Sequence, residues 1–181
     1  MILFVNGCVR EHSRTLELAK AVLAREMGDI QEVRLYPDGP EGLTADRLSQ
    51  RDRLLLDGNY DHPMFCWANQ FARADTIVIA APYWDLMFPA KVRAYLEAIT
   101  VSGITFQYGE DGIPQGLCKA DRLIYVTTAG GPVIQNFGYD YVAALARTFY
   151  GISDVRLVQA EGLDIWGADP DAILENAKKE I

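Results

Sequence analysis

Five short apolar runs, separated by segments of helical periodicity, constrain the fold of this chain more than any other feature. The runs occupy residues 2–6, 30–36, 76–82, 122–131 and 154–163. The run at 76–82 is continuously apolar, which is typical of a central strand buried on both faces. Strands that alternate with helices predict a doubly wound parallel sheet with right-handed crossovers. We therefore expect an α/β fold with five parallel strands, in one domain that spans residues 1–181.

The helical segments carry apolar stripes that should face this sheet. One helix is expected from about Ser13, with one face formed by Leu16, Ala19, Leu23 and Met27. Another is expected just after Pro89, with a stripe formed by Val92, Tyr95, Leu96 and Ile99. Further helices are expected within residues 44–63, 64–75 and 136–151 and after 171, whereas residues 104–121 are rich in turn residues and predict a long excursion from the sheet.

The net charge limits the kinds of binding partner that are expected, and the cysteine content indicates the cellular compartment. The net charge is −8 and the pI is about 4.7, so the field of the protein repels nucleic acid and anionic membrane surfaces. Three widely spaced cysteines, without metal-ligand spacing, favour a reduced cytoplasmic protein. We expect no signal peptide and no transmembrane segment. His12 and His62 share no metal-ligand spacing, so no metal site is predicted.

Three loops leave the carboxyl ends of the predicted strands, where open α/β sheets bind ligands. The first runs from Asn6 to Thr15 and offers the Ser13 and Thr15 hydroxyls, the Arg14 guanidinium and the first N–H groups of a helix. Such donors suit a phosphate, and the helix dipole favours its charge. The alternative is that Ser13 only caps its own helix.

The other two loops are aromatic and glycine-rich. Residues 82–89 place Tyr83 and Trp84 directly after a buried strand, where they could face a planar heterocycle or could be core or interface residues. Residues 127–132 contain Gly130 and Gly131, which would let the backbone approach a ligand closely or would simply form a turn with positive φ.

Together the three loops resemble those of the flavodoxin-like FMN-dependent NADH azoreductases and NAD(P)H–quinone oxidoreductases. The resemblance covers nearly the whole chain and is most specific in "ADTIVIAAPYWDLMFPAKVRAYLEAITVSGITFQY". It continues through "TTAGG" and through the "AEG" end of the last strand. It implies the strand order 2-1-3-4-5 with helices on both faces, FMN as cofactor, NADH or NADPH as electron donor, and a homodimer.

The resemblance also implies roles for individual residues. It places the FMN phosphate at Asn6, Ser13, Arg14 and Thr15, and the isoalloxazine at Pro82, Tyr83, Trp84, Asp85 and Leu86. Contacts to the pyrimidine side of the ring are implied for Thr128, Ala129, Gly130 and Gly131. Phe106 and Tyr108 are implied to border the substrate pocket, often across a dimer interface. No side chain is implied to be an obligatory acid or base.

Three residues depart from the family pattern. Trp84 and Asp85 replace the usual tyrosine and asparagine, and Ala129 stands where azoreductases often carry arginine. Asp85 has two interpretations. Its carboxylate could lie near the flavin edge and lower the reduction potential, or it could cap the helix that begins near Pro89.

Cys8 and Arg14 raise a different possibility, because their C-x5-R spacing resembles that of the cysteine phosphatases. A phosphatase would need Cys8 as a thiolate and an acid such as Asp169. However, Cys8 lies two residues further from the strand than in the low-molecular-weight phosphatases, and that interpretation leaves "APYWDLMFP" and "TTAGG" unexplained.

The resemblance therefore implies an FMN-dependent NAD(P)H oxidoreductase that reduces quinones by ping-pong hydride transfer, with azo or other aromatic compounds as further candidate acceptors. Two alternatives stay open. One is a flavin-binding electron carrier without NAD(P)H activity, and the other is the cysteine phosphatase.

Overall fold

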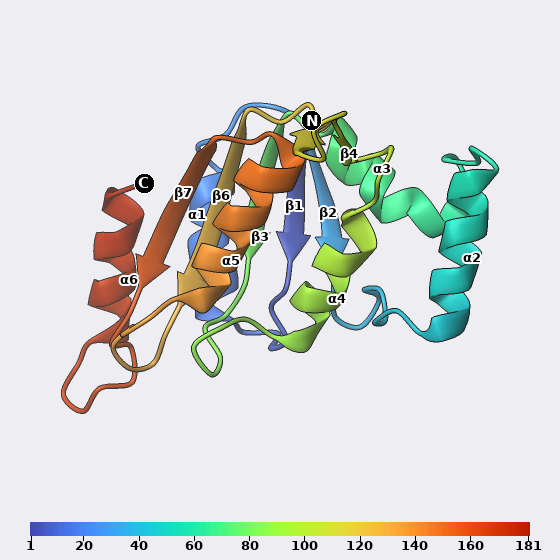
Figure 1. Ribbon diagram of the computed structural model, residues 1–181. Helices are drawn as coiled ribbons and strands as arrows, with labels where there is room; N and C mark the ends of the chain where they lie inside the picture. The colour runs from blue at the N-terminus through green and yellow to red at the C-terminus, as the bar shows by residue number, and fades with distance from the viewer.

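A computed structural model describes residues 1–181 and contains a five-stranded parallel sheet between two layers of helices (Figure 1). The strands are β1 (Ile2–Asn6), β2 (Ile30–Arg34), β3 (Thr76–Ala80), β6 (Arg122–Thr128) and β7 (Asp154–Ala160). Their order is β2-β1-β3-β6-β7, and every neighbouring pair is parallel. In terms of these five strands this is the order 2-1-3-4-5, so the predicted fold is confirmed.

Helices cover both faces of the sheet. On one face lie α1 (Arg14–Leu23) and α6 (Pro170–Lys179), and on the other lie α3 (Cys66–Arg73), α4 (Ala90–Ile99) and α5 (Phe137–Leu145). A 3₁₀ turn, η1 (Pro63–Phe65), precedes α3, and a π-helical turn, η2 (Ala146–Tyr150), continues α5. None of the helices combines the length and the apolar character needed to cross a bilayer.

Side chains that alternate along the central strands form two hydrophobic cores, one on each face of the sheet. Leu3 and Val5 of β1 join the core under α3, α4 and α5, whereas Ile2 and Phe4 join the core under α1 and α6. Successive side chains of a strand point to opposite faces, so a strand buried on both faces must be apolar throughout. The predicted stripe on α4 is confirmed, because all four of its residues lie in the first core.

The predicted stripe on α1 is partly wrong. Met27 is 98% exposed, because α1 ends at Leu23 and the chain then leaves the helix in a turn. The buried face is centred on Leu18 and Val22, one position away from the predicted one, and includes Thr15, Ala19 and Leu23. Packing against β3 and β6 sets this face.

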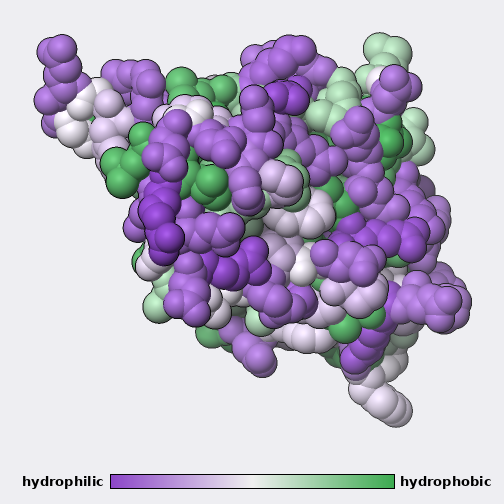
Figure 2. Space-filling model, turned by 90° about the vertical axis from the view of Figure 1, so that its right-hand side faces the viewer, coloured by the Kyte–Doolittle hydropathy of each residue, from purple (hydrophilic) through white to green (hydrophobic).

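Two parts of the chain lie outside the layers. Helix α2 (Ala45–Leu56) has no buried residue, and it stands apart at the side of the molecule where polar residues cover most of the surface (Figures 1 and 2). The turn-rich excursion forms an antiparallel hairpin from β4 (Phe106–Tyr108) and β5 (Pro114–Gly116). This hairpin packs on Tyr150 and Gly151, which precede β7, so it lies at the amino-terminal edge of the sheet.

Candidate functional site

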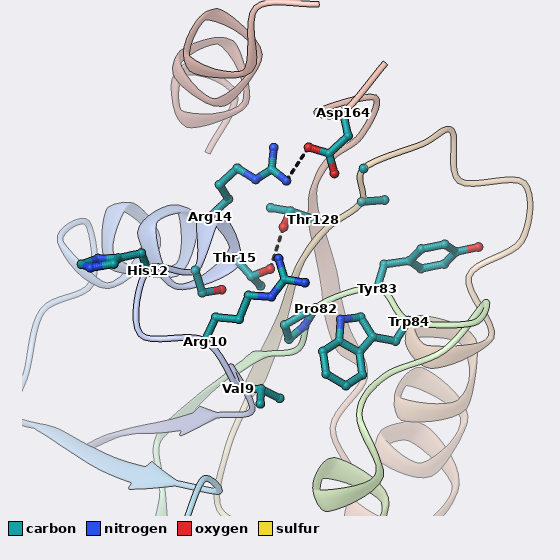
Figure 3. A pocket seen from close by; sticks show the side chains of 13 residues that line it. Val9, Arg10, His12, Arg14, Thr15, Pro82, Tyr83, Trp84, Thr128 and Asp164 are labelled. Carbon is teal, nitrogen blue, oxygen red and sulfur yellow. Dashed lines mark hydrogen bonds and ion pairs between the residues drawn. The ribbon is translucent and has the colours of Figure 1, made fainter. Parts of the chain in front are cut away.

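A pocket opens at the opposite edge, beyond the carboxyl ends of β1, β3 and β6 (Figure 3). The strand order changes direction between β1 and β3, and such switch points are where open α/β sheets bind ligands. The three loops singled out in the sequence meet here. The pocket is lined by Val9, Arg10, His12, Ser13, Arg14, Thr15, Pro82, Tyr83, Trp84, Thr128, Ala129, Gly130 and Asp164.

The first loop presents the amino terminus of α1 to this pocket. Ser13 is the N-cap residue, and its Oγ accepts a hydrogen bond of 3.3 Å from the backbone N–H of Leu16. The backbone N–H groups of Arg14 and Thr15 have no acceptor within the protein. Free N–H groups at a helix amino terminus, aligned with the helix dipole, form a favourable place for an anion. Ser13 therefore caps the helix, and it lies beside these free N–H groups.

A buried hydrogen bond joins the first loop to the third. The Oγ1 atoms of Thr15 and Thr128 are 2.6 Å apart, and both residues are buried. Thr15 lies in the first turn of α1 and Thr128 is the last residue of β6. Because either hydroxyl can donate to the other, one hydrogen of the pair is left to reach an acceptor in the pocket.

Arg14 is already engaged within the protein. Its Nη2 donates to Asp164 Oδ1 at 2.8 Å, and its Nη1 donates to the backbone oxygen of Leu163 at 3.2 Å. Asp164 belongs to the loop between β7 and α6, so the ion pair ties that loop to α1 (Figure 3).

The second loop forms one wall of the pocket and then a tight turn. Trp84 and Met87 exchange two backbone hydrogen bonds of 3.0 and 2.8 Å around Asp85 and Leu86. Both central residues have positive φ, 50° and 66°, as in the type I′ turns of hairpins. Asp85 is exposed on this turn. Helix α4 has Pro89 as its N-cap and no side-chain cap, so the interpretation of Asp85 as a helix cap is wrong.

The third loop brings backbone rather than side chains to the pocket. Ala129, Gly130 and Gly131 accept backbone hydrogen bonds of 3.3, 2.8 and 3.1 Å from Leu163, Asp164 and Gly162, in that order. A Cβ atom on Gly130 would lie 2.3 Å from Asp164 Oδ2. A side chain at 130 would displace the Asp164 carboxylate, so glycine leaves room for it beside the pocket.

Six residues predicted for the site do not line the pocket of their own chain. Asn6 holds the base of the first loop, because its Nδ2 donates to Glu32 Oε1 at 2.8 Å and its Oδ1 accepts from the Cys8 N–H at 3.0 Å. Asp85, Leu86 and Gly131 lie just outside the lining. Phe106 and Tyr108 sit on the hairpin at the opposite edge of the sheet, with their rings 5.4 Å apart.

Four lining residues were not singled out in the sequence, namely Val9, Arg10, His12 and Asp164. Position in the first loop was a usable signal for the first three. Arg10 points into the pocket, whereas His12 points away from its centre (Figure 3). Asp164 had no such signal, because its place depends on how the loop after β7 folds back onto Gly130.

Cys8 is poorly suited to act as a nucleophile. Its side chain is buried and does not line the pocket. Burial raises the pKa of the thiol to about 11, against a smaller lowering by the Ser13 side chain. The thiolate that a phosphatase requires is therefore disfavoured at neutral pH.

Comparison with known proteins agrees with this architecture. A family model described as flavodoxin-like fold matches residues 1–181. An FMN-dependent NADH:quinone oxidoreductase of Coprothermobacter proteolyticus is 34% identical, over 94% of this chain and 89% of that protein. An FMN-dependent NADH:quinone oxidoreductase 2 of Clostridium acetobutylicum is 36% identical, over 82% of this chain and 76% of that protein.

Solved structures show the same fold. The azoreductase from Bacillus anthracis strain Sterne superposes with a TM-score of 0.85 at 23% identity, over 99% of this chain and 95% of that chain. An FMN-dependent NADH-azoreductase from Bacillus anthracis strain Ames Ancestor, in complex with FMN, superposes with a TM-score of 0.82 at 24% identity, over 99% and 94% of the two chains. From the family match and the two relatives, we conclude that the chain belongs to the flavodoxin-like family that includes the FMN-dependent NADH:quinone oxidoreductases.

Proposed function

We propose that this protein is an FMN-dependent NADH:quinone oxidoreductase that also reduces azo or other aromatic acceptors. The observation that carries the proposal is the union of an anion-binding turn and an aromatic wall in one pocket at the switch point. That combination matches a cofactor with a phosphate at one end and a flat heterocycle at the other. The names of the relatives, together with the FMN complex of a structural neighbour, support the same cofactor and donor.

The residues present fit FMN at both ends. At the phosphate end we assign the free N–H groups of α1, the Ser13 hydroxyl and the Thr15–Thr128 pair. At the ring end we assign Pro82, Tyr83 and Trp84 on one side and the backbone of Ala129 and Gly130 on another. Tyr83 is fixed there because its hydroxyl donates to the backbone oxygen of Gln135 at 2.9 Å. When bound, FMN supplies the hydride-accepting and hydride-donating chemistry that joins NADH oxidation to acceptor reduction.

The size of the pocket supports a homodimer. Its volume of about 180 Å³ is smaller than the ~300–1,000 Å³ of complete ligand sites. The phosphate fits inside one chain, and the ring must extend beyond it. Two large apolar side chains are exposed in the loops that follow β6 and β7, Ile134 at 87% and Trp166 at 99%. We propose that a second copy covers the mouth of the pocket and contributes Phe106 and Tyr108, which lie too far from the pocket of their own chain.

The decisive experiment combines cofactor identification with kinetics. The purified protein should show the visible spectrum of a flavin, and the released cofactor should be FMN. With NADH and a soluble quinone, initial rates should give the parallel double-reciprocal lines of a ping-pong mechanism. Light scattering should give the mass of a dimer at assay concentration, whereas a fully active monomer would refute the assembly.

Two results would favour the alternatives. Tight FMN binding without NADH or NADPH oxidation would indicate an electron carrier. Hydrolysis of an aryl phosphate that is lost in Cys8→Ser would indicate the phosphatase. We include a cytoplasmic location in the proposal, since Cys8, Cys66 and Cys118 are all free thiols.

A further inference from the structure

The pocket contains two guanidinium groups in unlike electrostatic situations. The Arg14 guanidinium is paired with the Asp164 carboxylate at 2.8 Å and also donates to a backbone oxygen. The Arg10 guanidinium lines the same pocket and takes part in none of the hydrogen bonds or ion pairs of the protein. A ligand phosphate would therefore meet one neutralised arginine and one free arginine.

The Arg14–Asp164 pair is built into the fold. Three backbone hydrogen bonds join residues 129–131 to residues 162–164 and hold Asp164 beside the pocket. Its carboxylate packs directly against Gly130, where no side chain competes for the space. The carboxylate balances the charge of Arg14, and it would repel a phosphate that approached that guanidinium.

Arg10 is placed to offer the pocket a positive charge that is not already paired. Its side chain extends from the first loop into the space between Thr15 and Trp84 (Figure 3). This uncompensated cation therefore lies in the same pocket as Ser13 and Thr15 of the first turn of α1. A flexible guanidinium can present two parallel donors to a phosphate.

We propose that Arg10 supplies the positive charge that binds the FMN phosphate, and that Arg14 ties α1 to the β7–α6 loop through Asp164. This inference rests on the proposed function and changes the role that the family resemblance gave to Arg14. The backbone N–H groups of the first turn of α1 keep their part in phosphate binding.

The test compares FMN with riboflavin, which lacks the phosphate. Apo-protein is titrated with each flavin, and flavin fluorescence quenching gives the dissociation constants. Arg10→Gln should weaken FMN binding about 10- to 100-fold, as expected for losing a charge-assisted contact, and should leave riboflavin binding within about threefold. The salt dependence of FMN binding should also become shallower in this variant.

The matched control is the double variant Arg14→Gln/Asp164→Asn, because it removes the ion pair without changing the net charge beside the pocket. It should change the ratio of FMN to riboflavin affinity by less than about threefold, with an unchanged salt dependence. A loss of that ratio in the double variant as large as in Arg10→Gln, or an unchanged ratio in Arg10→Gln, would overturn the assignment. Failure of the proposed function looks different, because it is read on the unsubstituted chain. FMN binding without oxidation of NADH or NADPH would overturn the reductase alone, whereas binding of neither flavin would overturn both proposals.

Discussion

The hydrogen bond between Thr15 and Thr128 should make a measurable contribution to stability. Both side chains are buried, and their Oγ1 atoms are 2.6 Å apart. Thr128→Val replaces the hydroxyl with a methyl group of similar size, so the shape of the pocket is kept. The Thr15 hydroxyl is then left buried without its partner, and an unsatisfied buried polar group costs about 1–3 kcal/mol. Thr15→Val has the mirror consequence for Thr128.

The double variant separates the hydrogen bond from other effects. When both hydroxyls are removed, no unsatisfied group is left, so Thr15→Val/Thr128→Val should lose much less than the sum of the single variants. We expect a coupling free energy of about 1–3 kcal/mol. A loss of ~2 kcal/mol in a single variant corresponds to a fall in Tm of roughly 4–8 °C for a chain of this length.

The assay is urea unfolding of the cofactor-free protein, followed by far-ultraviolet circular dichroism. Cofactor must be absent, because a bound phosphate would stabilise the folded state by mass action and mask the effect. The dependence of the free energy of unfolding on urea should be the same in all four proteins. Strictly additive single effects would show that the two hydroxyls do not depend on each other, and the reasoning would then be refuted.

Three further predictions follow from other parts of the structure. Gly116→Ala should lower the free energy of unfolding by about 1–3 kcal/mol, because the added Cβ would lie 2.2–2.4 Å from neighbouring backbone atoms. In Gly131→Ala the added Cβ meets nothing within 4 Å and should leave stability unchanged, so equal effects of the two variants in chemical denaturation would contradict the prediction. Because burial raises the pKa of Cys8 to about 11, its alkylation at pH 8 should be at least tenfold slower in the folded than in the unfolded protein, and the rate should rise only as the pH approaches 11, whereas the exposed Cys66 should react readily. Cys8→Ser should keep full reductase activity, and a peptide map that shows rapid modification of Cys8 would contradict its burial. Asp85→Asn should raise the reduction potential of bound FMN, because it removes a negative charge from the turn beside the aromatic wall, and an unchanged potential in a potentiometric titration would exclude the electrostatic role.

The strands and the strand-end loops were predictable from sequence because each rests on a local pattern. A strand that is buried on both faces must be apolar throughout. Leu3 and Phe4 show this, because they are adjacent in β1 and lie in the cores on opposite faces of the sheet. The N-cap role of Ser13 follows from its place just before a helical pattern. These features depend on few residues that are close together in the chain.

The features that the sequence did not predict depend on contacts between segments that are far apart in the chain. Asp164 reaches Arg14 across 150 positions of sequence, and only the folded loops show that the Arg14 charge is already balanced. The end of α1 at Leu23, which leaves Met27 exposed, follows from packing of the helix rather than from its periodicity. The hairpin that contains Phe106 was expected beside a substrate, and the direction of α4 carries it to the other edge of the sheet.

Helix α2 should unfold locally, at a lower free energy than the unfolding of the sheet. It buries no residue, and only Leu54 and Leu55 reach the small cluster around Phe65. Segments with few buried contacts exchange their amide hydrogens through local unfolding, at a free energy well below that of global unfolding. Deuterium should therefore enter residues 45–56 early, while the amides of β1, β3 and β6 stay protected. The same transient openings make this helix the preferred place for a protease to cut an otherwise folded chain.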